Sequence, residues 1–136
     1  MSVRIAVVAI DARDPVLVAD FWAAALGWVA WPDPDGGGVS LAPPGSGQPS
    51  GAAGPSIDVF PVPEGKAAKN RLHLDLRSDG TTQAAEVERL VTLGASRIDV
   101  GQPTEASWVV LADPEGNEFC VLQRSVQEVE SASSPG

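Results

Sequence analysis

One short segment places three chemically versatile side chains on a single face. Residues 71–77 alternate strictly, with leucines at every second position and His73, Asp75 and Arg77 on the other side of a predicted strand. A histidine beside a carboxylate can act as a general acid or base. The alternative is a histidine that lines a cavity and only forms a hydrogen bond with Asp75 or Asp58. His73, the only histidine of the chain, is therefore the candidate catalytic residue.

Two further residues could take part in chemistry or in ligand binding. Cys120 could form a covalent-catalysis pair with His73, or it could be a small buried apolar residue. No sequence signal for an oxyanion hole accompanies such a pair. Among the four tryptophans, Trp108 is the best candidate for stacking on a flat ligand. A single cysteine excludes an internal disulfide and favours a reducing compartment, so we expect a cytoplasmic protein.

The hydrophobic pattern predicts the elements that position these residues. Asp14-Pro15 is typical of a helix start, and Gly27 ends that helix. A second helix is predicted from about Thr82 to Leu93, with Gly94 after it. Strands are predicted at 3–10, 39–42, 57–62, 71–77, 97–100, 107–112 and 118–123.

The two halves of the chain are copies of one module. Ala25-Leu26-Gly27 matches Thr92-Leu93-Gly94 at the helix ends, and Leu41–Pro44 matches Leu111–Pro114 at a strand end. Both pairs lie about 70 residues apart, which is longer than a solenoid repeat. The sequence therefore predicts a single domain over 1–124 that contains two supersecondary modules.

The repeat also sets the limits of each module and relates their residues. Module one covers about 3–62 and module two about 69–123, and the polar, Ser-rich residues 125–136 are expected to be a disordered tail. Matching the last strands pairs Asp58 with Cys120. The helix-end offset pairs His73 with Ala6, give or take one residue.

Composition excludes several classes of partner. The net charge of −9 argues against binding to nucleic acid, whose phosphates require clustered Lys and Arg. The apolar start, Met1–Ile10, is too short for a signal peptide or a membrane span, so no membrane partner is expected.

Three motifs together resemble the vicinal oxygen chelate superfamily, which includes glyoxalases, bleomycin-resistance proteins and extradiol dioxygenases. They are the helix end Leu26–Trp28, the segment 69–76 and the closing hairpin 112–122. The resemblance extends from Val3 to Gln123 and is nearest to the small glyoxalase-like domain branch. It implies an α+β fold in which two βαβββ modules form a curved mixed sheet around a concave pocket, with the helices outside.

The resemblance also implies where a metal would bind. Enzymes of the superfamily hold a divalent ion through His on the first strand of a module and Glu on the last. The corresponding positions here are Ala6, Asp58, His73 and Cys120. Alanine cannot be a ligand, so neither a metal site nor another cofactor is expected. If a metal does bind, zinc held by Asp58, His73 and Cys120 is the set that these residue types favour.

We therefore expect a protein of the drug- or metabolite-binding, resistance type, which binds a small organic molecule in its concave pocket without the usual metal site. An enzyme remains an alternative, either a lyase, isomerase or dioxygenase with an altered metal site or a catalyst that uses His73 as acid and base. A non-catalytic regulatory module is the third alternative. Exposed strand edges favour a homodimer. The residues expected to line the pocket are Asp58, His73, Asp75, Trp108 and Cys120.

Overall fold

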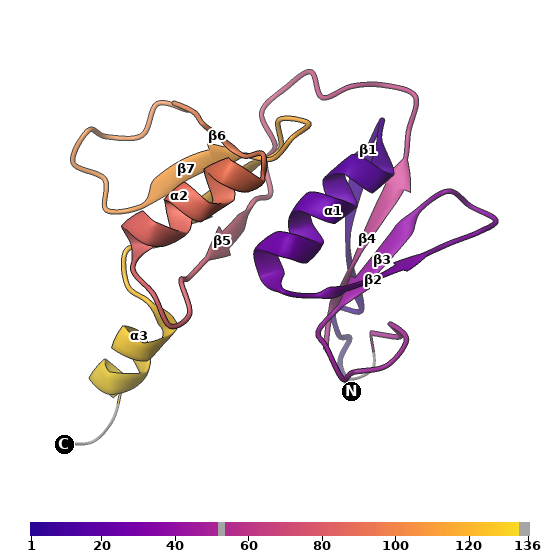
Figure 1. The fold of residues 1–136 in the computed structure, drawn as a ribbon, viewed down its shortest axis with the longest axis horizontal. Coiled ribbons are helices and arrows are strands. Elements are labelled where there is room, and N and C mark those ends of the chain that lie inside the picture. The colour runs from indigo at the N-terminus through magenta and orange to yellow at the C-terminus, as the bar shows by residue number, and fades with distance from the viewer. Residues whose placement is uncertain (52–53, 134–136) are drawn as a thin grey trace. The chain divides into compact units, whose positions relative to one another are not determined.

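The computed structural model describes residues 1–51 and 54–133, and the chain divides into two compact units. The first unit is Met1–Ala67 and the second is Ala68–Gly136. Each begins with the element order strand, helix, strand, strand, strand, and a further helix follows in the second unit (Figure 1). The predicted α+β class with two βαβββ modules is thereby confirmed.

The elements of the first unit are β1 (Val7–Ala12), α1 (Pro15–Leu26), β2 (Val29–Pro32), β3 (Val39–Ala42) and β4 (Ser56–Pro61). Those of the second unit are β5 (Leu74–Leu76), α2 (Gln83–Leu93), β6 (Ser96–Arg97), β7 (Val109–Ala112), β8 (Glu118–Val121) and α3 (Val126–Ser133).

The two sheets have the same topology. Their strand orders are β1-β4-β3-β2 and β5-β8-β7-β6. In each sheet the first strand pairs in parallel with the last, and the remaining neighbours are antiparallel. The last strand of each module is therefore central, between the first strand and the third, and its side chains have neighbours on both sides.

Helix α1 covers one face of the first sheet and has the predicted ends. The Asp14 side chain accepts a hydrogen bond from the backbone N–H of Leu17 at 3.2 Å, and Pro15 begins the helix. Gly27 ends it in the left-handed conformation, at φ 67°, which a residue without Cβ adopts without strain. The helix buries Val18, Ala19, Phe21 and Trp22.

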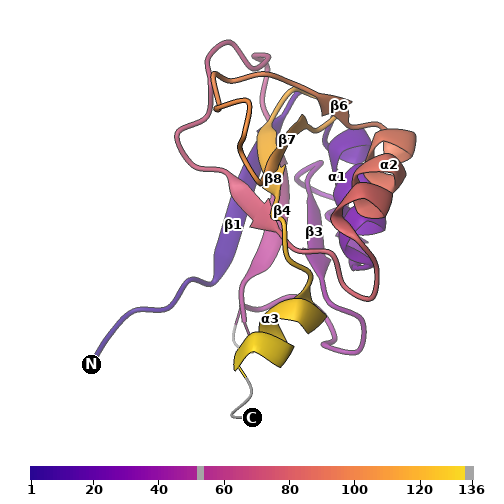
Figure 2. The ribbon, with the colours of Figure 1, turned by 90° about the vertical axis from the view of Figure 1, so that its left-hand side faces the viewer.

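Helix α2 has the same role in the second unit (Figure 2). The Thr82 hydroxyl accepts from the backbone N–H of Ala85 at 3.1 Å, and the helix buries Val87 and Leu90. Both predicted helices are confirmed. They could be predicted because side-chain capping and the helical spacing of apolar residues are properties of the local sequence.

Several predicted strands have different limits in the structure. The alternating segment 71–77 contributes only Leu74–Leu76, and Leu72 is 91% exposed instead of facing the core. The register explains this, since β8 offers a parallel partner to those three residues alone. The predicted strand 3–10 begins at Val7, opposite Ser56 of β4. The strand predicted at 97–100 is Ser96–Arg97.

The tight turn that joins β7 to β8 is organised by one buried carboxylate. Asp113 is 3% exposed and accepts hydrogen bonds from the backbone N–H groups of Glu115 and Asn117, at 2.9 and 3.0 Å. Gly116 occupies the position with positive φ, 93°. This turn sets the hairpin register and thereby the neighbours of the central strand.

Residues 126–133 form helix α3, where the sequence predicts a disordered tail. Ser125 and Glu128 explain the difference, because they make a reciprocal capping box. The Ser125 hydroxyl accepts from the Glu128 N–H at 3.1 Å, and the Ser125 N–H donates to the Glu128 carboxylate at 3.2 Å. The Val126 N–H also donates to the carbonyl of Ser78 at 2.8 Å. Residues 134–136 lie outside the described residues.

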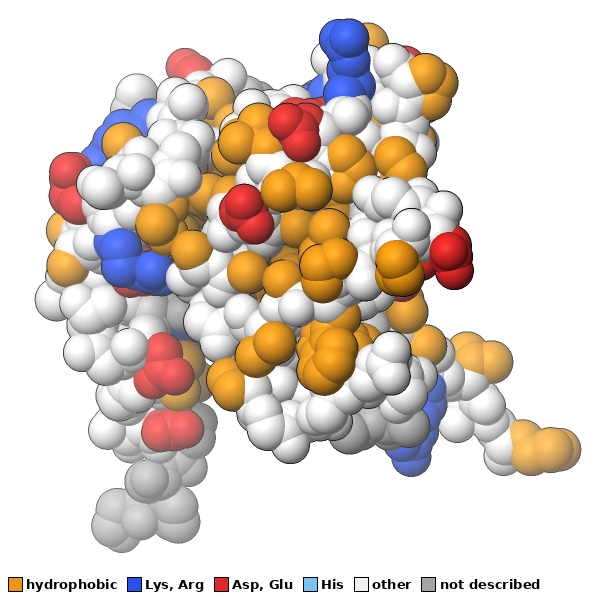
Figure 3. All heavy atoms as spheres, turned by 45° about the vertical axis from the view of Figure 1, so that its right-hand side comes forward, with side chains coloured by type: hydrophobic (Ala, Val, Ile, Leu, Met, Phe, Trp, Pro, Cys, Tyr) orange, Lys and Arg blue, Asp and Glu red, His pale blue; other side chains and the backbone are white. Residues whose placement is uncertain are grey.

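Hydrophobic side chains gather in the middle of the face shown in Figure 3. Among the exposed apolar residues of the first unit are Val16 and Leu17 of α1 and Val29 and Trp31 of β2.

No helix in the described part of the chain combines the length and the apolar character that a membrane span needs.

Candidate functional site

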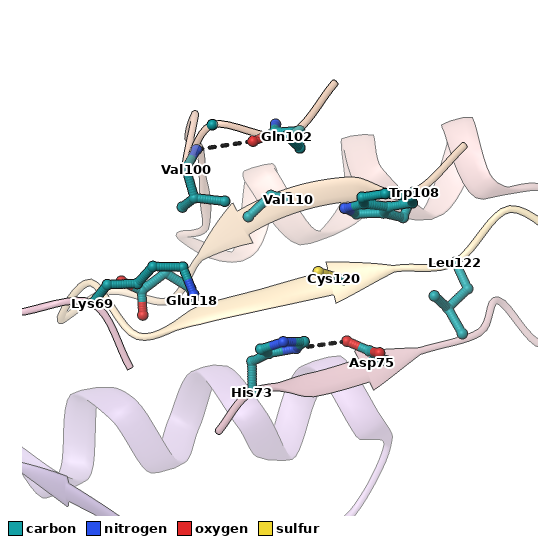
Figure 4. A pocket seen from close by; sticks show the side chains of 11 residues that line it. Lys69, His73, Asp75, Val100, Gln102, Trp108, Val110, Glu118, Cys120 and Leu122 are labelled. Atoms are coloured by element: carbon teal, nitrogen blue, oxygen red, sulfur yellow. Dashed lines mark hydrogen bonds and ion pairs between the residues drawn. The ribbon is translucent and has the colours of Figure 1, made fainter. Parts of the chain in front are cut away.

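The second unit contains a cavity of about 410 Å³ over the strands β5, β8 and β7. This volume is within the range of small-molecule sites, about 300 to 1,000 Å³. Figure 4 shows Lys69 and Glu118 at one end of the cavity and Trp108 and Leu122 at the other. The lining residues are Lys69, His73, Asp75, Val100, Gly101, Gln102, Trp108, Val110, Glu118, Cys120 and Leu122.

The strand register brings the reactive side chains together. Asp75 of β5 lies opposite Cys120 of β8 in the parallel ladder. On the other side, Cys120 lies opposite Val110 of β7. His73 is two residues before Asp75, and Figure 4 shows both side chains directed toward the strand that carries Cys120. The expected pocket residues His73, Asp75, Trp108 and Cys120 thus line one cavity.

Asp75 interacts with both His73 and Cys120. Its Oδ1 lies 2.9 Å from Nδ1 of His73, and the two side chains are 45% and 41% exposed. The Asp75 carboxylate also acts on the Cys120 thiol, whose pKa it raises. Because an ionised carboxylate only accepts, Nδ1 of a neutral His73 carries the proton and Nε2 is left as the acceptor. Nε2 of His73 is then the basic atom of the site.

Cys120 is held in its neutral form. It is 9% exposed, and burial raises the pKa of its thiol above the ordinary value. The negative charge of Asp75 raises this pKa further, while the charge of Lys69 lowers it by a smaller amount. A protonated thiol is a poor nucleophile, so this arrangement disfavours the Cys120–His73 pair as a covalent catalyst.

The apolar end of the cavity is supported from helix α2. Trp108 is 38% exposed and forms part of the wall. The side-chain amide of Gln83 donates to the carbonyl of Ser107 at 2.9 Å and to that of Val121 at 3.1 Å. One side chain therefore bridges the residue before Trp108 and the residue after Cys120.

The polar end is built from the segment before β5 and from the closing turn. The Glu118 side chain accepts from the backbone N–H of Asn70 at 3.1 Å, and the Asn70 amide donates to Asn117 at 3.0 Å. Nζ of Lys69 donates to the carbonyl of Asn70 at 3.2 Å. Sequence reasoning missed Lys69 and Glu118 as pocket residues, although both belong to the motifs that carried the resemblance. The hydrogen bond that joins these two segments connects residues 48 positions apart, Asn70 and Glu118, so no local sequence pattern indicates that the segments meet.

The first unit has different residues at the equivalent positions. Its register places Ala9 and Ser40 on either side of Asp58, as Asp75 and Val110 flank Cys120. Asp58 and Cys120 therefore correspond. The same register makes Ala9 the counterpart of Asp75, and Val7, one residue from Ala6, the counterpart of His73. Asp58 is half-buried on β4 of the first unit and is not among the residues that line the described cavity.

One group of side chains in the second unit could hold a metal ion. One ligand atom from each of His73, Asp75 and Cys120 lies within 4.8 Å of the others. Tetrahedral zinc bound to N, O and S keeps its donors about 3.3 to 3.6 Å apart, so small side-chain movements would suffice. This donor set fits zinc and does not fit Mg²⁺ or Mn²⁺, which prefer oxygen ligands. The set differs from the one expected from the sequence in having Asp75 where Asp58 was named.

Comparison with known proteins gives a consistent picture of the fold. Residues 7–122 match the family described as the glyoxalase-like domain. The sequence has no match among the curated proteins.

Solved structures with this fold include proteins of several activities. A glyoxalase/bleomycin resistance protein/dioxygenase family enzyme from Burkholderia phytofirmans PsJN has 20% identity and a TM-score of 0.60, covering 88% of this chain and 97% of the other. The fosfomycin resistance protein FosX from Mesorhizobium loti has 12% identity and a TM-score of 0.59, covering 90% and 92%. TnmS3, an antibiotic binding protein from Streptomyces sp. CB03234, has 16% identity and a TM-score of 0.52, covering 91% and 98%. At these identities the likeness shows the fold alone.

Proposed function

The chain belongs to the glyoxalase-like domain family, and from this premise we propose that it binds a small organic molecule in the cavity of its second unit. The observation that carries the proposal is the division of this cavity into two ends (Figure 4). Trp108 and Leu122 offer an apolar surface for a flat ring. Lys69 and Glu118 at the opposite end, together with His73 and Asp75 along β5, offer polar groups that fix a ligand's orientation. The ligand class is therefore a planar molecule with a polar group at one side.

The proposal requires no metal site shared between the two modules. Val7 and Ala9 occupy the positions in the first unit that correspond to His73 and Asp75, and neither side chain can be a ligand.

The likeness to TnmS3, an antibiotic binding protein, and to FosX, a fosfomycin resistance protein, is compatible with a role in binding or resistance. The net charge of −9 favours a neutral or cationic ligand over an anionic one.

The test begins with native mass spectrometry of the full chain, purified without chelator or metal-affinity column. An organic mass retained by the folded protein identifies the ligand class directly. Binding is then measured by titration with acridine orange, a planar aromatic cation. Trp108→Ala should weaken binding about tenfold, since the loss of an aromatic wall is worth about 1 kcal/mol or more.

Trp31→Ala is the matched control, because Trp31 and Trp108 are both 38% exposed and only Trp108 lines the described cavity. Equal affinities in the two variants would contradict the proposal. A protein that retains no organic mass and binds no planar probe, but co-purifies with a protein partner, would favour a regulatory module instead.

A second candidate is acid–base catalysis by His73, which the hydrogen bond of 2.9 Å to Asp75 favours. A carboxylate that orients Nδ1 leaves Nε2 to take a proton from a bound substrate. The expected result is that His73→Ala abolishes turnover of the identified ligand and leaves the circular dichroism spectrum unchanged. Binding without turnover by the wild-type protein would exclude this candidate.

A further inference from the structure

We infer that the second unit contains a complete three-ligand zinc site formed by His73, Asp75 and Cys120, with no contribution from Asp58. This inference departs from the expectation that no metal binds, and it does not depend on the organic ligand. Its basis is the placement of three donors of different chemistry on one face of two adjacent strands.

The backbone geometry already brings these donors together. Residues two apart on a strand project from the same face, and a residue opposite on the next strand projects beside them. Asp75 is opposite Cys120, and His73 comes two residues before Asp75. Nδ1 of His73 and Oδ1 of Asp75 are 2.9 Å apart, and the three ligand atoms lie within 4.8 Å of one another. No strand needs to move for them to share one ion.

The chemistry of the donors selects the ion. Imidazole nitrogen, carboxylate oxygen and cysteine sulfur form a mixed set that zinc accepts and that hard cations bind poorly. Three protein ligands leave the fourth tetrahedral position open, as in catalytic zinc sites. All three residues line the cavity of about 410 Å³, so this position faces the space proposed for the organic ligand.

The first unit cannot form an equivalent site. Val7, Ala9 and Asp58 stand where the second unit has His73, Asp75 and Cys120, and this leaves one donor of three. The ligand set inferred here differs from the set expected from the sequence in one residue, since Asp75 replaces Asp58. In the superfamily pattern implied by the resemblance, the position of Asp75, two residues beyond the histidine, has no metal role.

The experiment titrates the metal-free full chain with zinc in competition with a chromophoric chelator, and counts bound ions by native mass spectrometry. Wild type should bind one zinc per chain. Asp75→Asn should weaken binding by about a hundredfold or more, since even groups that only support metal ligands are worth about 10- to 100-fold. His73→Gln and Cys120→Ser should do the same. Asp58→Asn is the matched control and should bind as wild type does.

Cobalt substitution supplies a second readout, because a thiolate ligand gives Co²⁺ a charge-transfer band in the near ultraviolet. The band should be present in wild type, Asp58→Asn and Trp108→Ala, and absent in Cys120→Ser. Circular dichroism in the presence of chelator checks that each variant is folded, as expected for substitutions of the half-exposed His73 and Asp75.

Three results would overturn the inference: a wild-type chain that binds no zinc at micromolar concentration, zinc affinity that Asp75→Asn leaves unchanged, or affinity that Asp58→Asn abolishes. Since zinc alone is the probe, failure here leaves the organic-ligand proposal standing. Loss of acridine orange binding in Trp108→Ala with zinc retained would separate the two sites.

Discussion

Asp75 and Cys120 face each other across the parallel ladder of β5 and β8, and the Asp75 carboxylate raises the pKa of the Cys120 thiol. The same carboxylate is bonded to His73 at 2.9 Å. In the first unit the matching ladder pairs Ala9 with Asp58. The second module therefore has two reactive side chains, Asp75 and Cys120, at positions where the first module has an alanine and one aspartate.

This pairing predicts how Cys120 reacts with alkylating agents. Burial and the charge of Asp75 raise the pKa of the thiol, so the reactive thiolate is scarce at neutral pH and increases only as the pH passes above the ordinary thiol pKa. Asp75→Asn removes the charge and should lower the pKa of Cys120. The rate of reaction with iodoacetamide near neutral pH should then rise several-fold in the metal-free protein.

The control for this prediction is Asp79→Asn, which removes a carboxylate bonded to Gln127 and not to the thiol. Its alkylation rate should match wild type at every pH. Rates are followed by the mass of the alkylated chain in the presence of chelator. A rate that is unaffected by Asp75→Asn would mean that burial alone keeps the thiol protonated.

Local features of the fold were predictable from the sequence. Asp14-Pro15 and Thr82 begin their helices as predicted, since a capping side chain needs only the next three residues to act. The turn at Asp113 is likewise formed within five residues. The shortening of the strand predicted at 71–77 could not be foreseen, because a strand extends only as far as its partner does.

The candidate site was predictable in its residue types and not in its geometry. Alternation placed His73 and Asp75 on one face, and the internal repeat matched Asp58 with Cys120. The identity of the third donor depends on which strands are adjacent. Only the β5–β8 register shows that Asp75, 45 positions before Cys120 in the chain, lies opposite the thiol.

Gln83 is predicted to control the apolar end of the cavity from outside it. Its amide donates to the carbonyls of Ser107 and Val121, at 2.9 and 3.1 Å. Gln83→Glu keeps the size and replaces the donor with a charged acceptor, so both carbonyls would face a carboxylate. We expect a loss of about 1 to 3 kcal/mol in the free energy of unfolding, and weaker binding of acridine orange through displacement of Trp108.

Gln123→Glu makes the same chemical change at an exposed position and serves as the control. Denaturant unfolding and probe titration are measured on both variants. Gln83→Asn retains an amide donor on a shorter side chain. If this variant keeps part of the acridine orange binding that Gln83→Glu loses, the hydrogen bonds of Gln83, and not the size of its side chain, position Trp108. Two variants with identical stability and binding would show that Gln83 has no such role.

Two buried serines should respond in opposite ways to the same substitution. Ser78 is 1% exposed, and its hydroxyl has no hydrogen-bond partner among the described residues. Ser125 is 5% exposed and accepts from the N–H of Glu128 at the start of α3. Ser78→Ala removes a buried hydroxyl whose loss of hydration is not offset by a hydrogen bond among the described residues, so it should stabilise the protein by about 1 kcal/mol. Ser125→Ala removes a helix cap and should destabilise it by about 1 kcal/mol.

Thermal unfolding measures both effects, as shifts in Tm of about 3 to 6 °C in opposite directions. Far-ultraviolet circular dichroism should lose helical signal for Ser125→Ala, because α3 has eight residues and depends on its cap. The backbone carbonyl of Ser78, which accepts from Val126, is unchanged by either substitution. A destabilised Ser78→Ala variant would therefore refute the sign predicted for that site.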